Sequence, residues 1–443
     1  MQNKATKQYW KLGCALLLAL TSVVSQALPA FARQTGQNCV ACHVSFPELT
    51  PYGRMFKLNG YTIGKQKVVP LAAMAIASTT HVANQQGNSQ AYPRNGDLEF
   101  ESASLFLAGK LGEHVGAFSQ WTYNNLNPEA LPNGGTKFTG HFTVDNNDWR
   151  VADRITQDGT DLIYGASVNN NPTVQDVWNS TPGFSYPYQT SRLQGAWGIG
   201  WPATLIEGAL AQQSAGMTAY MMLDKHFYAE FGAYRAANGA FRIFSENLHM
   251  GTRLKAGNPY WRFAYSGESG ADSFEVGTFG MAANVYVDPL DVTAGRNRYR
   301  DFGVDAQYQH LLDPHVWTAQ ASFIHEKESW DPSLVGSAYA NSHDTLNSFH
   351  LKGSYWYNRR YGATLGYFAE HGSTDALANA NPSGKPDATG WIGEFNYMIE
   401  QNWRLGLQYT AFQKYQGGSS NYDGNGRNAR DNNITYLYTW YAY

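Results

Sequence analysis

Charged residues, cysteines and long apolar runs are all scarce in this sequence of 443 residues. Charged residues make up 15% of the chain, and three residues are cysteines. Beyond residue 32, no stretch approaches the roughly 18 apolar residues that a transmembrane helix requires, which excludes a helical membrane protein. Beyond the same point, 29 Lys and Arg stand against 35 Asp and Glu, a net charge of −6. No basic patch suited to nucleic acid is present, so we expect no nucleic-acid partner.

The one apolar run in the chain lies at its N-terminus. Three lysines within the first 11 residues precede an apolar stretch at residues 12–20. Small residues follow in the order that a signal peptidase recognises, either as Ser25-Gln26-Ala27 or as Ala30-Phe31-Ala32. This arrangement is typical of a secretory signal peptide, and the run is too short to span a membrane. We therefore predict that residues 1–32 are a cleaved signal peptide and that the protein is exported.

Aromatic residues and glycine, in contrast, are abundant. Aromatic residues reach 14% of the chain, with 29 Tyr and 13 Trp, and there are 44 glycines. Outer-membrane β-barrels have such a composition, because aromatic girdles lie at both membrane interfaces and hydrophobicity is distributed over alternating strands. A large secreted β-sandwich or propeller is the alternative. A propeller would show an internal repeat of about 20–50 residues, and none is visible.

Apolar and polar residues alternate with period 2 from about residue 68 to the C-terminus, which predicts β-strands. In residues 349–357, the apolar positions Phe349, Leu351 and Tyr355 alternate with His350 and Lys352. After a short turn at residues 358–360 the alternation resumes, as expected for a β-hairpin. The same pattern occurs in the pairs of segments 302–308 with 317–323 and 391–397 with 405–409.

Three features favour a membrane barrel over a soluble sandwich. Several of the predicted strands have about 10–13 residues, which is the length that a tilted membrane strand requires. Short turns alternate with long polar connections, as in barrels with periplasmic turns and outer loops. The chain ends on an aromatic strand at residues 434–443. The long connections are expected at residues 124–136, 329–344, 372–387 and 416–431.

We therefore predict an all-β protein in which residues 67–443 form a transmembrane antiparallel β-barrel in contact with the lipid of the cell outer membrane. Between 16 and 18 strands can be counted, and 16 is the expected number, since bacterial single-chain barrels have an even number of strands. Polar side chains on the inner face would line the lumen, where carboxylates and histidine could guide a cation, although barrel interiors are polar in any case. The lumen candidates are Asp305, His350, Lys352, Glu370 and Glu394.

The segment Cys39-Val40-Ala41-Cys42-His43 has the C-x-x-C-H pattern of c-type haem attachment. Two thiols bond to the haem vinyl groups, and the adjacent histidine is the proximal axial ligand of the iron. A short-loop disulfide is an alternative, because an exported chain enters an oxidising compartment. A thioredoxin-like pair would need a βαβ unit, and a zinc site would need a second cysteine pair. We predict one covalently attached haem c.

The haem segment, predicted at residues 33–66, is expected to be mostly helical or irregular and too small to fold alone. Chains below about 40 residues seldom bury a sufficient core, so the segment should pack against the barrel as a plug. The sixth iron ligand is less defined by the sequence. Met74 is the first candidate, Met55 and His81 are alternatives, and an open sixth position is also compatible with the sequence.

Residues 31–61, which contain the haem motif, resemble the fused monohaem cytochrome c–porin family. The resemblance is specific over residues 31–75 and only architectural over the barrel. It implies a small cytochrome segment before a 16-stranded barrel, with haem attached at Cys39 and Cys42 and ligated by His43. Members of this family are known for the oxidation of extracellular ferrous iron. The resemblance identifies no iron-binding residue in this chain.

These features together predict electron transfer across the outer membrane. An extracellular donor such as Fe(II) would supply the electron, and a periplasmic cytochrome would accept it. An electron-transfer protein is thus expected rather than an enzyme. Two alternatives remain at this stage: a porin in which the haem segment is a gate or anchor, and a haem enzyme with an open sixth position that acts on peroxide or sulfur compounds.

Overall fold

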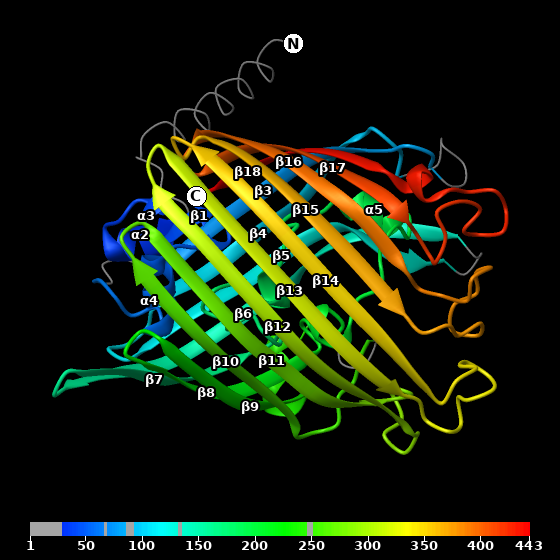
Figure 1. Ribbon diagram of the computed structural model, residues 1–443, viewed down its shortest axis with the longest axis horizontal. Helices are drawn as coiled ribbons and strands as arrows, with labels where there is room; N and C mark the ends of the chain where they lie inside the picture. Colours follow the sequence, from blue (N-terminus) through cyan, green and yellow to red (C-terminus); the bar gives the residue numbers. More distant parts are fainter. Residues whose placement is uncertain (1–28, 66–68, 86–92, 132–134, 246–250) are drawn as a thin grey trace, which may run out of the picture.

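The computed structural model describes residues 29–65, 69–85, 93–131, 135–245 and 251–443, in which 16 antiparallel strands form a closed barrel (Figure 1). Each strand pairs with its neighbours in the sequence, and the last strand closes the barrel by pairing with the first, from Ile434–Val82 to Ala442–Met74. The predicted number of 16 strands is confirmed. Residues 1–28, which include most of the predicted signal peptide, lie outside the described residues. The barrel strands are β3 (Leu71–Val82), β4 (Leu98–Lys110), β5 (Val115–Ala130), β6 (Thr136–Gln157), β7 (Thr160–Asn169), β8 (Ser214–Leu223), β9 (Phe227–Ala236), β10 (Asn258–Ser269), β11 (Asp272–Tyr286), β12 (Arg296–Leu312), β13 (His315–Ser329), β14 (His343–Tyr357), β15 (Tyr361–Gly372), β16 (Ala388–Glu400), β17 (Trp403–Lys414) and β18 (Ile434–Ala442).

The two faces of the strands differ as the alternation predicts. On β14, Lys352 and Trp356 face inward and are 3% and 2% exposed, whereas Leu351 faces outward and is 45% exposed. Exposed Phe302, Val304 and similar side chains continue this apolar outer face on other strands. A closed barrel satisfies the backbone hydrogen bonds between its strands, so such a face can contact lipid. The protein is therefore an outer-membrane β-barrel.

The connections differ in length at the two ends of the barrel (Figure 1). At one end, turns of two to four residues join the strands, for example at residues 313–314, 358–360 and 401–402. The start of β3 and the end of β18 lie at this end. Long loops lie at the other end. In outer-membrane barrels the short turns face the periplasm, so we call this end the periplasmic end.

One long connection was placed wrongly from the sequence. Residues 124–136 were expected to form a loop, but β5 continues to Ala130 and β6 begins at Thr136. Asn127 pairs with Thr139 and Ala130 pairs with Thr136, after a register shift. The hairpin extends because the pairing partner on β6, rather than hydrophobicity, determines where a polar strand ends. The loops expected at residues 329–344, 372–387 and 416–431 lie between strands as predicted.

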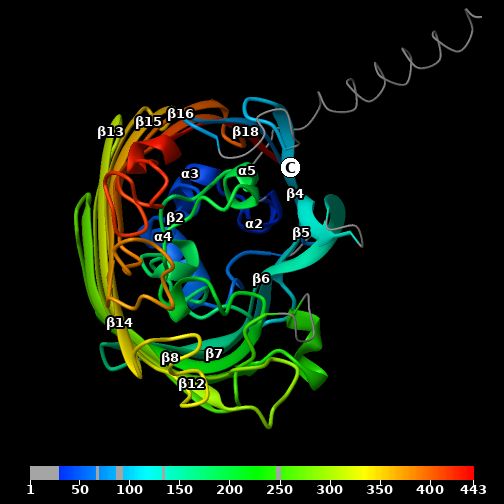
Figure 2. The ribbon, with the colours of Figure 1, turned by 90° about the vertical axis from the view of Figure 1, so that its right-hand side faces the viewer.

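Residues 29–65 form a plug in the lumen near the periplasmic end (Figures 1 and 2). No helix in the described ranges is long and apolar enough to cross a membrane. Helix α4 begins with Pro51 and is capped by the side chain of Thr50, which accepts a hydrogen bond from Gly53 N at 3.2 Å. The plug is mostly helical, with one small sheet that was not predicted. Its elements are α2 (Pro29–Thr35), α3 (Cys39–Cys42), β1 (His43–Ser45), β2 (Glu48–Leu49) and α4 (Pro51–Leu58).

The folded plug begins before residue 33, where the sequence analysis placed its start. Ala30 and Ala32 are buried, and the ring of Phe31 stacks on Tyr61 with 5.6 Å between ring centroids. Of the two expected cleavage sites, the one after Ala27 would retain this packing. Cleavage after Ala32 would remove it.

Buried polar contacts hold the plug in the barrel. The Arg54 guanidinium donates to Gln307 Oε1 at 2.9 Å and to Ser273 Oγ at 3.0 Å. Lys352 Nζ of β14 lies 2.6 Å from Glu48 Oε2. When one partner of such a buried pair is removed, the remaining charge is left uncompensated at a cost of about 3–5 kcal/mol. The plug is thus fixed to several strands at once.

A second segment, residues 170–213 between β7 and β8, also folds into the lumen (Figure 2). Lys57 of the plug donates to the carbonyl oxygens of Val174 and Asp176, at 2.7 and 2.6 Å. Asp176 also forms an ion pair with Arg262 of β10 at 3.0 Å. This inner segment was not predicted from the sequence, because its polar residues resemble those of an external loop. Its short helices are η1 (Pro182–Phe184), α5 (Arg192–Ala196) and η2 (Leu205–Glu207); η3 (Gly239–Phe244) and η4 (Ala429–Asn432) lie in other connections.

Candidate functional site

The C-x-x-C-H motif lies on one helical turn of the plug. Cys39 and Cys42 are the first and last residues of α3, and His43 begins β1 directly afterwards. Helix α4 passes very close to this turn at Gly53. A Cβ atom added to Gly53 would lie 2.2 Å from the carbonyl oxygen of Cys42, so only glycine fits there. Burial raises the pKa of the Cys42 thiol to about 11, and the neighbouring Cys39 thiol contributes to this increase. The motif is therefore held in place by the plug's own packing.

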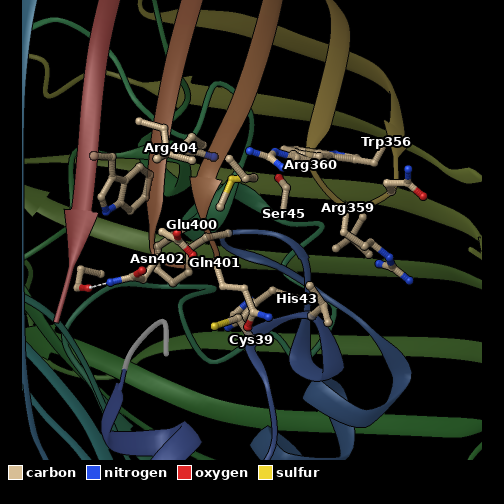
Figure 3. Close-up of a pocket in the computed structure, with 18 of the residues that line it drawn as sticks. Cys39, His43, Ser45, Trp356, Arg359, Arg360, Glu400, Gln401, Asn402 and Arg404 are labelled. Carbon is tan, nitrogen blue, oxygen red and sulfur yellow. Dashed lines mark hydrogen bonds between the residues drawn. The ribbon is translucent and has the colours of Figure 1, made fainter. Parts of the chain in front are cut away.

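A cavity of about 410 Å³ separates the motif from the barrel wall at the periplasmic end (Figure 3). This volume is within the range of ligand sites in proteins, roughly 300–1,000 Å³. Cys39 and His43 form its plug side, and Met74 of β3 contributes from the wall. The turns at residues 358–360 and 401–402 form its periplasmic rim. We call this space the main cavity.

A smaller hollow of about 70 Å³ adjoins the motif and shares Cys39, His43 and Phe46 with the main cavity. Cys42 lines this smaller hollow, together with apolar plug residues. The ring of Phe46 lies between His43 and Trp440 of β18, with centroids 5.3 and 5.1 Å away. Cys39 and His43 thus border both the main cavity and the smaller hollow, and Cys42 borders the smaller hollow. Together these neighbouring spaces have the aromatic walls that a large planar cofactor requires.

His43 has the properties of a metal-ligating histidine. Its Nδ1 atom is buried and has no hydrogen-bond partner among the residues that the structure describes. Enclosure in the barrel lowers the pKa of the imidazole to about 4, an effect partly opposed by the backbone of Glu48. The ring is therefore neutral at pH 7, which is the form that ligates metals.

Nitrogen donors without hydrogen-bond partners lie on the opposite side of the main cavity. The Nη1 atom of Arg359, the Nη2 atom of Arg404 and the Nε1 atom of Trp356 are each buried, and none of these atoms has a hydrogen-bond partner in the described part of the chain. The Nε atom of Arg359 is ion-paired with Asp313 at 2.8 Å, so only part of its guanidinium remains open to a ligand. All three residues line the main cavity (Figure 3). Unpaired buried donors are costly, especially on a guanidinium group, unless a ligand satisfies them. An anionic group such as the propionate carboxylates of haem would do so. The residues present therefore fit the implied haem c.

The structure separates the three candidates for the sixth ligand. Met74 lines the main cavity and packs near Phe46. Met55 instead packs against the cluster that contains Leu58 and Trp178, away from both hollows. The proposal of His81 was wrong: its side chain is exposed on the outer face, because even-numbered positions of β3 such as Ile76 face inward.

A further methionine at the main cavity was not predicted from the sequence. Met398 of β16 lines the main cavity and packs near Val44 of the plug. Its position could have been found, since it continues the inward series of Glu394 and Asn396. Met74 and Met398 are therefore both available as thioether ligands at the same cavity.

All five predicted lumen residues lie on the inner face of the barrel, but in different roles. Asp305 pairs with Arg262 at 2.8 Å, and Lys352 pairs with Glu48 of the plug. Glu394 accepts hydrogen bonds from Gln408, Asn396 and Tyr438. His350 and Glu370 are adjacent to one another and to Glu207 of η2, a residue that the sequence analysis did not identify.

Comparisons with known proteins show no family for this chain. No protein-family model matches the sequence, and no curated protein matches it. Similar solved structures include the outer membrane protein OmpT of Vibrio cholerae, at 10% identity and a TM-score of 0.44, covering 84% of this chain and 98% of OmpT. DcaP of Acinetobacter baumannii, an outer membrane channel, is 12% identical with a TM-score of 0.44 and coverages of 84% and 96%. An anion-selective porin from Comamonas acidovorans is 12% identical with a TM-score of 0.44 and coverages of 84% and 98%. By its own strand topology and apolar outer face, this chain is a 16-stranded outer-membrane β-barrel.

Proposed function

We propose that the protein transfers electrons at the outer membrane through one haem c, attached at Cys39 and Cys42 and ligated by His43. One observation carries the proposal: the main cavity brings the attachment motif together with Met74 and with the unpaired guanidinium donors of Arg359 and Arg404. When bound, the haem supplies a one-electron redox centre. The thiols and the imidazole on the plug side would attach and ligate the haem. The arginines on the opposite side would pair with its two carboxylates.

The protein's own residues would hold and tune this centre. Arg404 is buried in β17 and stacks on Trp440, with 4.3 Å from its Cζ to the ring centroid, so its charge is fixed in position. Met74 or Met398 would supply the sixth ligand, and a thioether raises the potential relative to a second histidine. With either methionine bound to the iron, the sixth position would be occupied, and the protein could not act as a haem enzyme that needs this position open.

The position of the main cavity defines the direction from which the acceptor approaches. Its rim consists of periplasmic turns, including Arg360 and Gln401. A soluble periplasmic cytochrome could therefore dock at this end, whereas the donor would arrive from the outer end of the barrel. The plug and residues 170–213 occupy much of the lumen, so the donor would have to be small. Fe(II) meets this condition, and the net negative charge of the chain favours a cation.

The chemistry balances as a simple one-electron transfer. One Fe(II) loses one electron and becomes Fe(III), and the periplasmic acceptor gains one electron. Carboxylates on the inner face of the barrel can bind the cation on its way inward. No proton needs to move in this exchange.

The test is spectroscopy of the full protein, produced in a host that matures c-type cytochromes and purified from its outer membrane. We expect covalently attached haem, a low-spin six-coordinate spectrum, and rapid reduction when Fe(II) is added under anaerobic conditions. Cys42→Ala should weaken attachment, and His43→Ala should abolish the low-spin spectrum. A protein without covalent haem under these conditions would refute the proposal.

A porin with the plug as a gate is the second candidate, and the porin-like barrel is the observation that favours it. It predicts solute conductance in planar lipid bilayers, and the conductance should persist in Cys42→Ala. The buried pair between Glu48 and Lys352 opposes a plug that swings freely. Conductance of the unaltered protein at porin level would favour this candidate over electron transfer alone.

A further inference from the structure

We propose that Glu207, His350 and Glu370 form a binding site for a divalent transition-metal ion inside the barrel. Glu207 belongs to η2 in the inner segment, and the other two residues belong to β14 and β15. Their potential ligand atoms all lie within 4.8 Å of one another. His350 Nε2 is 2.9 Å from Glu370 Oε1 and 3.7 Å from Glu207 Oε1. Three donors from three separate elements thus converge on one point.

The carboxylate of Glu370 is a second, independent indication of a cation. The residue is fully buried, and its Oε2 atom has no hydrogen-bond partner among the described residues. Its Oε1 atom contacts His350 and accepts a hydrogen bond from Ser348 at 3.2 Å. Burying a carboxylate oxygen without a partner is unfavourable. A bound cation would satisfy it.

The other two ligands are held in a suitable orientation. Glu207 Oε2 accepts hydrogen bonds from the amide and hydroxyl of Thr204, at 2.8 and 2.9 Å. Glu207 Oε1 accepts a hydrogen bond from Ser348 Oγ at 2.7 Å and faces His350. The His350 ring also has a hydrogen bond with the backbone of Tyr186. Metal-ligating histidines almost always have such an outer partner, which fixes the ring and its tautomer.

The surroundings leave room for a further ligand. A space of about 30 Å³ borders His350, together with Ser180 and Tyr186. This space is large enough for one water molecule beside the imidazole, and neither Glu207 nor Glu370 lines it. Two more lumen acids, Asp301 and Glu326, accept hydrogen bonds from the backbone N atoms of Ile206 and Leu205 in η2. They anchor η2 and place additional acidic groups near the site.

Two carboxylates and one imidazole select the class of metal. Such oxygen and nitrogen ligands suit Fe(II), Mn(II) and Zn(II), whereas Cu(I) prefers thiolate or thioether ligands. The existence of the site does not require haem. Its role rests on the proposed function: the site would hold an Fe(II) donor within the lumen, between the outer end of the barrel and the main cavity.

The binding test uses the full protein in detergent, titrated calorimetrically with Zn(II), with Mn(II) and, under anaerobic conditions, with Fe(II). We expect one ion per chain. His350→Gln, Glu370→Gln and Glu207→Gln should each weaken binding by about tenfold or more, since even outer-shell substitutions at metal sites weaken binding by about 10–100-fold. The matched controls are His325→Ala on the outer face of β13 and Glu129→Gln in the β5–β6 hairpin, which should bind normally. Heat-dependent electrophoretic mobility would verify that every variant is folded.

The outcomes distinguish this site from the haem proposal. Metal binding should persist in Cys42→Ala, and the haem spectrum should be unchanged in His350→Gln. Reduction of the haem by Fe(II) should slow in His350→Gln, whereas reduction by dithionite should not. Absence of stoichiometric binding, or equal affinity in folded triad variants and controls, would overturn the site even if haem is attached as proposed.

Discussion

Replacing Lys352 with methionine would leave Glu48 of the plug buried without its cation. The two charged groups are 2.6 Å apart, and their side chains are 3% and 1% exposed. The other contacts of Glu48 are weak, at 3.4 Å to Gln309 and 3.5 Å to the Tyr188 hydroxyl. Loss of one partner from a buried pair costs about 3–5 kcal/mol. The population of chains with a displaced plug should therefore rise by roughly two to almost four powers of ten.

Hydrogen exchange of the plug amides, residues 29–65, measures this population directly, because exchange reports local opening. We expect protection of the plug to fall in Lys352→Met while protection of the strands is retained. Lys414→Met is the matched control, since Lys414 is partly exposed and lies 3.4 Å from Asp387; such pairs contribute about 0–1 kcal/mol.

A double variant, Lys352→Met with Glu48→Gln, supplies the decisive comparison. Removing both charges restores much of the lost stability when the cause is an unpaired buried charge. Unchanged protection in the single variant would refute the reasoning. So would a double variant that exchanges faster than the single one, because the loss would then come from packing of the lysine stem.

Three further predictions concern the motif and the main cavity. Gly53→Ala should destabilise the plug by about 1–3 kcal/mol through overpacking against α3, whereas Gly195→Ala, with open space around it, should not; equal hydrogen exchange in both would contradict this. Either Met74→Leu or Met398→Leu should alter the low-spin optical spectrum and Met55→Leu should not, and an effect of Met55→Leu alone would assign the ligand to the plug. Arg404→Gln should lower the midpoint potential by on the order of tens of millivolts in a redox titration, because a buried positive charge favours the reduced state; an unchanged potential would place the charge away from the redox centre.

The barrel was predictable because strand formation and membrane exposure leave a local pattern of period 2. Positions such as Val304 and Leu351 are on the outer face for the same reason that they alternate with Asp305 and Lys352. The same rule excludes His81 as a sixth ligand. His81 is at an odd-numbered position of β3 and faces outward, whereas Met74 is at an even-numbered position and faces inward. Residues 124–136 could not be assigned in this way, because the extent of a polar hairpin depends on its partner strand.

The C-x-x-C-H motif is likewise a local pattern, since five consecutive residues form it, and haem attachment there stays a prediction. The surroundings of the motif do not follow from a local pattern. Met74, Met398 and Arg404 come from three strands and meet His43 only where the plug enters the barrel. Unpaired donors become visible only when burial is known, because the same arginine on a surface would be satisfied by water.

The sequence by itself determined the strands and the polarity of the two barrel faces, because each depends on residues that are near one another in the chain. The signal peptide and haem attachment stay predictions from equally local patterns. Only the tertiary structure decided that residues 170–213 fold inward and that Glu207 lies beside His350 and Glu370. The physical reason is closure of the barrel, which creates a shared interior for segments that are more than 100 residues apart. Burial in that interior, rather than any local pattern, selects which polar groups are paired and which remain open to a ligand.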